Sequence, residues 1–194
     1  MGAVLVLEHF PGPSMEAAVL QAKQRRFDED LSKRLFTQLI EAIGYLHEKG
    51  IIHRDVKPAN ALLSEDLTDL RLADFNTAKS TEDGSALTLT GTIDYLPPEV
   101  LLGSSLCEGS DVWAAGLCLH FMLSGALPRR RKLFTTNAAF GQAALQHVQV
   151  PLSGEQWQHL GLSAACFDVL GACLQVDVEK RATAKEVRDF AWMN

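Results

Sequence analysis

Several features that would direct a protein to a membrane or to an oxidising compartment are missing from this sequence. The apolar opening, MGAVLVLEHF, is too short to span a bilayer and lacks the basic flank of a signal peptide. No C-x-x-C pair occurs, which argues against the common zinc-binding and redox motifs. We therefore expect a cytoplasmic protein whose thiols are reduced and lie in the core. These thiols belong to Cys107, Cys118, Cys166 and Cys173.

A net positive charge is missing as well. The formal net charge is -6 at pH 7 and the pI is about 5.5, so we expect neither nucleic acid nor an acidic membrane as a partner. The basic run RRRK at 129–132 is interpreted as a solvated loop. With 194 residues, of which 47% are hydrophobic, and no repeat or linker, the chain is predicted to form one domain over residues 1–194.

The spacing of the apolar residues that are present predicts a mainly helical fold. An amphipathic helix is expected over residues 28–49, because leucine or isoleucine recurs every three or four positions and Gly50 follows. Residues 111–124 are apolar nearly all round, which is typical of a helix buried at the centre of a domain. Further helices are predicted after three capping residues, Ser14, Ser163 and Thr183.

The predicted strands are short. Residues 4–7 form one, and residues 61–63 and 70–73 are predicted to pair as a hairpin. Residues 74–99 are rich in Thr, Ser, Asp and Gly and contain few apolar residues before Tyr95. We expect a long loop there, of the kind that often carries function.

The stretch HRDVKPAN, residues 53–60, places a carboxylate, an ammonium group and an amide close together. Asp55, Lys57 and Asn60 follow the long predicted helix and precede the hairpin, so they can surround one substrate. Asp74 follows at the end of the hairpin. A carboxylate and an amide oxygen are hard ligands that suit Mg²⁺ carrying phosphates.

Four further motifs accompany this stretch. They are DFN at 74–76, GTIDYLPPE at 91–99, DVWAAG at 111–116 and Arg181 before the last predicted helix. In these five motifs the sequence resembles the large, C-terminal lobe of a eukaryotic-type serine/threonine protein kinase, over nearly the whole chain. The resemblance implies a mainly α, kinase-like α+β fold with a hinge strand and short β-hairpins.

The resemblance implies transfer of the ATP γ-phosphate to a Ser or Thr hydroxyl of a protein substrate. Asp55 resembles the base that accepts the hydroxyl proton, and Lys57 resembles the cation that neutralises the transferring group. Asn60 and Asp74 resemble the Mg²⁺ ligands. Thr92, within GTIDY, supports the serine/threonine type.

The resemblance also locates the ATP site and the structural supports. The hinge backbone would lie at 8–10, and the residues implied around adenine are Leu7, Glu8, Phe10, Met15 and Leu62. Glu99 and Arg181 resemble a buried ion pair, and Asp111 resembles the anchor of the catalytic loop. His53 and Phe75 resemble two members of an apolar stack.

Regulation by an upstream kinase is a further implication. Thr88 is the leading candidate for an activating phosphate and Thr90 the second. Arg54, directly before Asp55, is expected to pair with that phosphate.

The sequence departs from the family pattern in three places. Pro97 stands where the family has alanine, and Asn76 stands where it has the glycine of Asp-Phe-Gly. Asn tolerates positive φ better than most residues, so the turn after Asp74 is expected to survive. No G-x-G-x-x-G occurs, and the first lysine, Lys23, already follows the hinge.

Two interpretations therefore stay open at this point. In the first, the chain is the C-terminal lobe of a kinase without its small lobe, either a fragment or a truncated gene model. It would then bind Mg-ATP weakly and be inactive by itself. In the second, it is a noncatalytic, pseudokinase-like scaffold or docking module.

Overall fold

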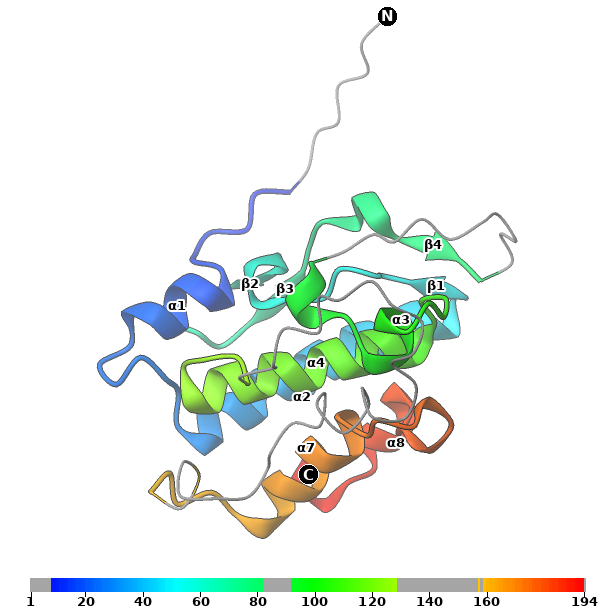
Figure 1. Cartoon of the computed structure of the whole chain (residues 1–194). Coiled ribbons are helices and arrows are strands. Elements are labelled where there is room, and N and C mark those ends of the chain that lie inside the picture. Colours follow the sequence, from blue (N-terminus) through cyan, green and yellow to red (C-terminus); the bar gives the residue numbers. More distant parts are fainter. Residues whose placement is uncertain (1–7, 82–91, 129–156, 158, 194) are drawn as a thin grey trace, which may run out of the picture.

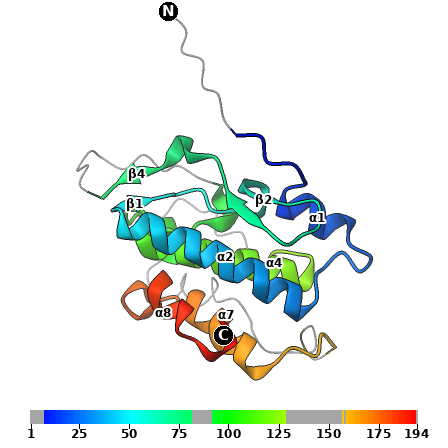
Figure 2. The ribbon, with the colours of Figure 1, turned by 180° about the vertical axis from the view of Figure 1, so that it is seen from behind.

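Two long helices lie side by side at the centre of the molecule. The computed structural model describes residues 8–81, 92–128, 157 and 159–193. Helices α2 (Glu29–Glu48) and α4 (Glu108–Ser124) form the central pair (Figure 1). The short strands lie on one side of this pair, and α7 (Ala164–Cys173) and α8 (Ala184–Arg188) lie on the other, as the view from behind also shows (Figure 2). Helix α1 (Met15–Gln21) packs near one end of the pair.

Capping side chains begin four of these helices, three of them at the predicted capping residues. Asp28 Oδ1 accepts a hydrogen bond from Leu31 N at 2.8 Å, which confirms the start of α2. The predictions for α1, α7 and α8 are confirmed in the same way, since each N-cap side chain accepts a bond from the first turn. These caps are Ser14, Ser163 and Thr183.

The predicted start of the central helix was wrong by three residues. Helix α4 begins at Glu108 rather than at Asp111, because Cys107 is its N-cap. The Ser110 hydroxyl oxygen accepts a hydrogen bond from Cys107 N at 3.0 Å and closes the turn. Cysteine is not a usual capping residue, so no local signal marks this start. Asp111 consequently lies within the first turn of a helix that is already formed.

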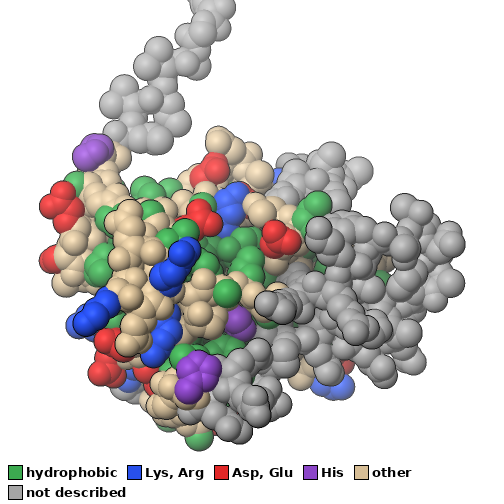
Figure 3. Space-filling model, turned by 60° about the vertical axis from the view of Figure 1, so that its left-hand side comes forward, with side chains coloured by type: hydrophobic (Ala, Val, Ile, Leu, Met, Phe, Trp, Pro, Cys, Tyr) green, Lys and Arg blue, Asp and Glu red, His purple; other side chains and the backbone are tan. Residues whose placement is uncertain are grey.

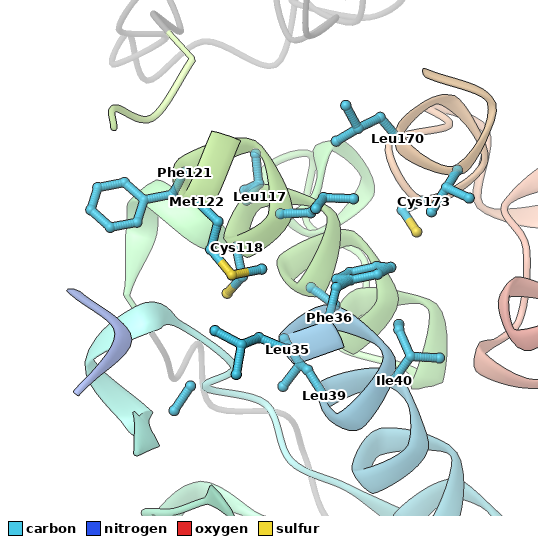
Figure 4. Packing of buried hydrophobic residues seen from close by; sticks show 14 of the residues in the cluster. Leu35, Phe36, Leu39, Ile40, Leu117, Cys118, Phe121, Met122, Leu170 and Cys173 are labelled. Atoms are coloured by element: carbon cyan, nitrogen blue, oxygen red, sulfur yellow. The ribbon is translucent and has the colours of Figure 1, made fainter. Parts of the chain in front are cut away.

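The hydrophobic core is centred on the contact between α2, α4 and α7 (Figure 4). A Cβ atom added at Gly116 would come within 2.7 Å of the Cys173 Cβ, so the close approach of α4 and α7 requires glycine. All four cysteines are free, as predicted, although Cys107 is only partly buried. Burial raises the pKa of Cys166 and Cys173 to about 12, so these thiols stay protonated and pack as apolar groups. The side chains labelled in Figure 4 are Leu35, Phe36, Leu39, Ile40, Leu117, Cys118, Phe121, Met122, Leu170 and Cys173.

Two antiparallel strand pairs cover the other side of the helices. Strands β2 (Ala61–Leu63) and β3 (Leu70–Leu72) form the predicted hairpin. A second pair, β1 (Ile51–Ile52) with β4 (Lys79–Ser80), was not predicted, because two-residue strands show no periodicity. The expected strand at residues 4–7 lies outside the described residues.

The loop predicted at 74–99 is more structured than expected in its described parts. Besides β4 it contains 3-10 turns at Phe75–Thr77 and Ile93–Tyr95 and a short helix, α3 (Pro98–Leu101). Pro97 is the N-cap of α3. Its missing N–H costs nothing at a helix start, which explains why proline can replace the family alanine.

The described surface is mixed in character. On the face shown in Figure 3, basic and acidic side chains alternate with hydrophobic atoms. Within the described residues, none of the helices combines the length and the apolar character needed to cross a membrane. The basic run at 129–132 lies outside them.

A bidentate ion pair fastens α3 to the C-terminal helices. Arg181 Nη1 and Nη2 donate to Glu99 Oε1 and Oε2 at 2.7 and 2.8 Å. Arg181 also donates to the carbonyl oxygens of Gln175 and Gly109, each at 2.9 Å, and its guanidinium lies 5.0 Å from the centre of the Trp113 ring. Each of the three guanidinium nitrogens of this buried cation therefore has a partner, which offsets its loss of hydration.

Breaking this pair should destabilise the fold strongly. We expect Glu99→Gln to lower the free energy of unfolding by about 3 kcal/mol, because Arg181 is left buried without its counter-charge. Denaturant unfolding of the purified chain measures this. Asp177→Asn is the control, because Asp177 forms an exposed ion pair with Lys180 at 3.1 Å and its loss should have a much smaller effect. Equal effects of the two substitutions would contradict the expectation.

The buried imidazole of His120 makes stability depend on pH. Burial lowers the pKa of His120 to about 4, although Nδ1 donates to the Ala126 carbonyl oxygen at 2.9 Å. The Trp157 ring packs edge-on against the His120 ring, and the two ring centroids are 4.9 Å apart. In the unfolded chain this histidine takes up a proton near pH 6.5, whereas in the folded chain it does so only near pH 4.

Stability should therefore fall as the pH is lowered from about 6.5 toward 4. Unfolding free energies at pH 7 and at about pH 4.5 would be compared for the parent chain and for His120→Asn, whose amide can still donate to Ala126. We expect a smaller loss in the variant, because it lacks a group that the unfolded state protonates in this pH range and the folded state does not. An identical loss in both proteins would rule out His120 as a source of the pH dependence.

Candidate active site

One buried carboxylate holds the 53–60 loop in place. Asp111, in the first turn of α4, accepts hydrogen bonds from His53 N at 2.8 Å and Arg54 N at 2.9 Å. His47 Nε2, near the end of α2, lies 3.0 Å from the same carboxylate. These contacts keep Arg54 at a φ of 69°, a left-handed conformation that non-glycine residues seldom adopt. The structure thus places Asp111 where an anchor of the loop is needed.

The predicted catalytic residues converge on the Asp55 side chain. Lys57 Nζ lies 2.6 Å from Asp55 Oδ2, and Asn60 Nδ2 lies 3.0 Å from the same oxygen. The other oxygen, Oδ1, accepts from Thr92 N at 3.1 Å and from Thr92 Oγ1 at 3.2 Å. Lys57 Nζ also donates to Thr92 Oγ1 at 2.9 Å. The structure brings these four residues together around one carboxylate.

His53 joins this loop to the turn that follows the hairpin. Its ring is buried, with Nε2 3.0 Å from the Ala73 carbonyl oxygen and Nδ1 3.4 Å from Asp55 N. The Phe75 ring packs edge-on against it, with centroids 4.9 Å apart. Phe75 itself is half exposed. The two residues expected to stack are therefore in contact.

The two candidate metal ligands lie at adjacent ends of β2 and β3. Ala61 pairs with Leu72, and Ala73 N donates to the Asn60 carbonyl oxygen at 2.9 Å, so Asp74 leaves the hairpin beside Asn60. Asn60 uses its side-chain nitrogen to contact Asp55, and its Oδ1 is the atom suited to a cation. Among the described residues, no three His, Cys, Asp or Glu side chains are grouped so that they could hold a metal ion. One carboxylate and one amide nevertheless fit Mg²⁺, which takes most of its ligands from water and phosphates.

The expectation for Asn76 needs correction. The positive φ of this turn belongs to Asp74, at 64°, and not to Asn76. Asn76 lies within the 3-10 turn Phe75–Thr77, and its N–H points to Asp74 Oδ1 at 3.5 Å. A side chain at position 76 therefore causes no backbone strain in this conformation, and the replacement of glycine is tolerated for that reason.

The segment expected to bind adenine is fastened along β2. Leu63 N donates to the Pro13 carbonyl oxygen at 2.9 Å, and Ser14 forms a β-bridge with Leu62. Gly12 packs so closely on the backbone at Leu63 that a Cβ atom would lie 2.1 Å from its carbonyl oxygen. The expected hinge at 8–10 has no regular secondary structure, Glu8 is exposed, and Leu7 lies outside the described residues.

Two side chains near this segment have surroundings that the sequence did not predict. Met15 is fully buried in the core, so in this structure it presents no surface to a nucleotide and supports the site from within. The Arg71 guanidinium lies 5.5 Å from the centre of the Phe10 ring, across the hairpin from Leu62. Sequence reasoning missed Arg71, because an arginine on a short strand gives no sign of an aromatic partner distant in the chain.

The candidate regulatory residues are only partly covered. Thr88 and Thr90 lie outside the described residues. Arg54, expected to face a phosphate, donates through Nε to the Thr77 carbonyl oxygen. Its side chain therefore has a structural contact within the site that the sequence did not reveal.

Comparison with known proteins shows the family to which this chain belongs. The family model for the protein kinase domain matches residues 2–193. Aurora/IPL1-related protein kinase 2 of Caenorhabditis briggsae is 30% identical over 190 residues, which cover 97% of this chain and 58% of that protein. Aurora kinase B of Drosophila melanogaster is 32% identical over 172 residues, 89% of this chain and 49% of that kinase.

A plant relative is also a protein kinase, and its name specifies the serine/threonine type. CBL-interacting serine/threonine-protein kinase 14 of Arabidopsis thaliana is 43% identical over 129 residues, 63% of this chain and 28% of that protein. The chain thus spans less than two thirds of the length of each of these relatives. With the family model matched from residue 2 to residue 193, the chain belongs to the protein kinase domain family, and its relatives identify the serine/threonine type.

Proposed function

We propose that this chain carries the catalytic groups for transfer of the ATP γ-phosphate to a Ser or Thr hydroxyl of a protein. The observation that supports this most directly is the arrangement around Asp55, where Lys57, Asn60 and Thr92 all contact one carboxylate. A chain that only bound partners would have no chemical need for a carboxylate held in this way. The loop is also strained at Arg54, and strained backbone often accompanies a functional site.

In the proposed reaction Asp55 orients and deprotonates the acceptor. The proton of the acceptor hydroxyl moves to Asp55, the hydroxyl oxygen bonds to the γ-phosphorus, and the bond to the ADP oxygen breaks. Four contacts already occupy the carboxylate, and the longest, from Thr92 Oγ1 at 3.2 Å, is the one that the acceptor hydroxyl can replace. Lys57 places its ammonium group beside the transferring group, and Asn60 fixes the orientation of the loop.

The ATP and Mg²⁺ sites follow the same proposal. Asn60 Oδ1 and the Asp74 carboxylate would hold Mg²⁺, which supplies charge neutralisation at the phosphate oxygens when bound. The backbone at 8–10 would meet the adenine edge, with Leu62 below the ring and Leu7 as the gatekeeper. Because no G-x-G-x-x-G occurs in the sequence, we propose that the phosphate-covering lobe is not part of residues 1–194 and that these residues are inactive by themselves.

Replacement of the proposed base tests this function. In the full-length protein that contains this chain, we expect Asp55→Asn to reduce kcat by about 10²- to 10⁴-fold, because the amide cannot accept the proton. Transfer of radiolabelled phosphate from ATP to a generic protein substrate measures it. Asp30→Asn, an exposed acidic residue at the start of α2, is the matched control and should retain the parent rate. An unaltered rate in Asp55→Asn, or no transfer by the parent protein, would favour the noncatalytic module.

Phosphorylation of the segment after Asp74 is proposed as its regulation. A phosphate at Thr88 would bring a charge of about -1.5 to -2 toward Arg54. We expect Thr88→Ala to lower the transfer rate of the full-length protein several-fold and Thr90→Ala to lower it less. Mass spectrometry of the active protein should find the phosphate at Thr88. A Thr88→Ala rate within about twofold of the parent, less than about 0.5 kcal/mol in the barrier, would contradict this assignment.

A further inference from the structure

We infer that the Thr77 hydroxyl is a positioning group for phosphoryl transfer, because it ties the loop that carries Asp55 to the turn that carries Asp74. The inference rests on the proposed function, since it concerns the same reaction. Thr77 lies just beyond the DFN motif and has no predicted role from the sequence. Its side chain is half buried between the two segments.

Strands β1 and β4 stop pairing before they reach Arg54 and Thr77. Ile52 and Lys79 are the last residue pair of this two-stranded sheet. If the same register continued, Arg54 would lie opposite Thr77. The backbone ladder stops earlier because Asp111 takes the N–H groups of His53 and Arg54. The positive φ of Arg54 also turns its backbone out of the extended conformation.

Side chains join the two segments where the ladder has stopped. Thr77 Oγ1 donates to the His53 carbonyl oxygen at 3.1 Å. In the opposite direction, Arg54 Nε donates to the Thr77 carbonyl oxygen. These two bonds join the segments where no backbone ladder forms. Thr77 is the donor in one bond and the acceptor in the other, so the contact is reciprocal.

The turn 73–77 is fastened to His53 at both ends. At its start, Ala73 O lies 3.0 Å from His53 Nε2, and at its end, Thr77 Oγ1 contacts His53 O. Asp74, with a φ of 64°, lies between these two contacts. A residue in the left-handed region holds its position only where the surrounding structure fixes it. Loss of the Thr77 contact would free one end of the turn.

One residue, His53, therefore sets the spacing between the loop that carries Asp55 and the turn that carries Asp74. Asp55 follows it by two positions and Asp74 is held against it through Ala73 and Thr77. A small displacement of Asp74 relative to Asp55 would separate the metal ligand from the base, and misplacement of about 1 Å can cost about 10²-fold in rate. The Thr77 hydroxyl acts through these residues and does not touch the reacting atoms.

Three substitutions in the full-length protein separate this role from general packing. Thr77→Val removes the hydroxyl and preserves the shape, and Thr77→Ser restores the hydroxyl. Thr37→Val makes the same chemical change away from the site, where Thr37 Oγ1 donates to Lys33 O at 2.9 Å within α2. The measurements are kcat and KM for ATP, Mn²⁺ affinity in the presence of ADP by electron paramagnetic resonance, and melting temperature.

We expect Thr77→Val to lower kcat by about fivefold to tenfold, the equivalent of one lost hydrogen bond. Its affinity for Mn²⁺ with ADP should fall by about threefold or more, because Asp74 is one of the proposed ligands. Thr77→Ser and Thr37→Val should both remain within about twofold of the parent in kcat and in Mn²⁺ affinity. A purely structural role would instead lower the melting temperatures of the two valine variants and leave kcat and Mn²⁺ affinity unchanged.

The outcomes distinguish this inference from the proposed function. An active parent with unchanged kcat and Mn²⁺ affinity in Thr77→Val overturns the inference alone. Equal losses in Thr77→Val and Thr77→Ser also overturn it, because the hydroxyl would then not be the cause. A parent that neither transfers phosphate nor binds Mn²⁺ with ADP overturns both.

Discussion

The negative charge of Asp111 is the constraint on which the rest of the site depends. A carboxylate with 1% of its surface exposed is stable only if its oxygens are paired, and here the partners are two backbone amides of the 53–60 loop and the His47 ring. The hydrogen bonds that pair the charge are thus the same ones that fix the conformation of the loop. The most deeply buried helix supplies the carboxylate, so the position of the loop is as rigid as the core itself.

From this anchor the site is built outward through contacts of decreasing burial. His53 is buried, Asp55 and Lys57 are partly exposed, and Asp74 is exposed at the rim. Such a gradient suits the proposed function, in which the proposed base must keep its orientation while the proposed metal ligand must meet solvent and phosphate. It also explains why two non-glycine residues, Arg54 and Asp74, can remain at positive φ, since each lies beside a fixed contact.

Much of this arrangement could be predicted from the sequence where the signal was local. The periodicity over 28–49 and the caps at Ser163 and Thr183 predicted helices correctly, because both signals arise within a few residues. Motif spacing likewise predicted that Asp55, Lys57 and Asn60 would meet. The failures concern contacts between distant segments: the β1–β4 pair, the stacking of Arg71 on Phe10 and the burial of Met15. None of these leaves a pattern in the neighbouring residues, and the capping of α4 by Cys107 was hidden by an unusual residue type.

The burial of α4 on all sides has a consequence for synthesis of the protein. Every residue from Ser110 to Leu123 is buried, and part of that cover comes from α7, which begins at Ala164, 40 residues after Ser124. At a synthesis rate of about 5–20 residues per second, synthesis of α7 begins about 2–8 s after α4 is complete. During that interval an almost wholly apolar helix depends on α2, made earlier, for cover. Nascent chains stalled before residue 164 should accordingly be favoured substrates of chaperones that bind apolar segments.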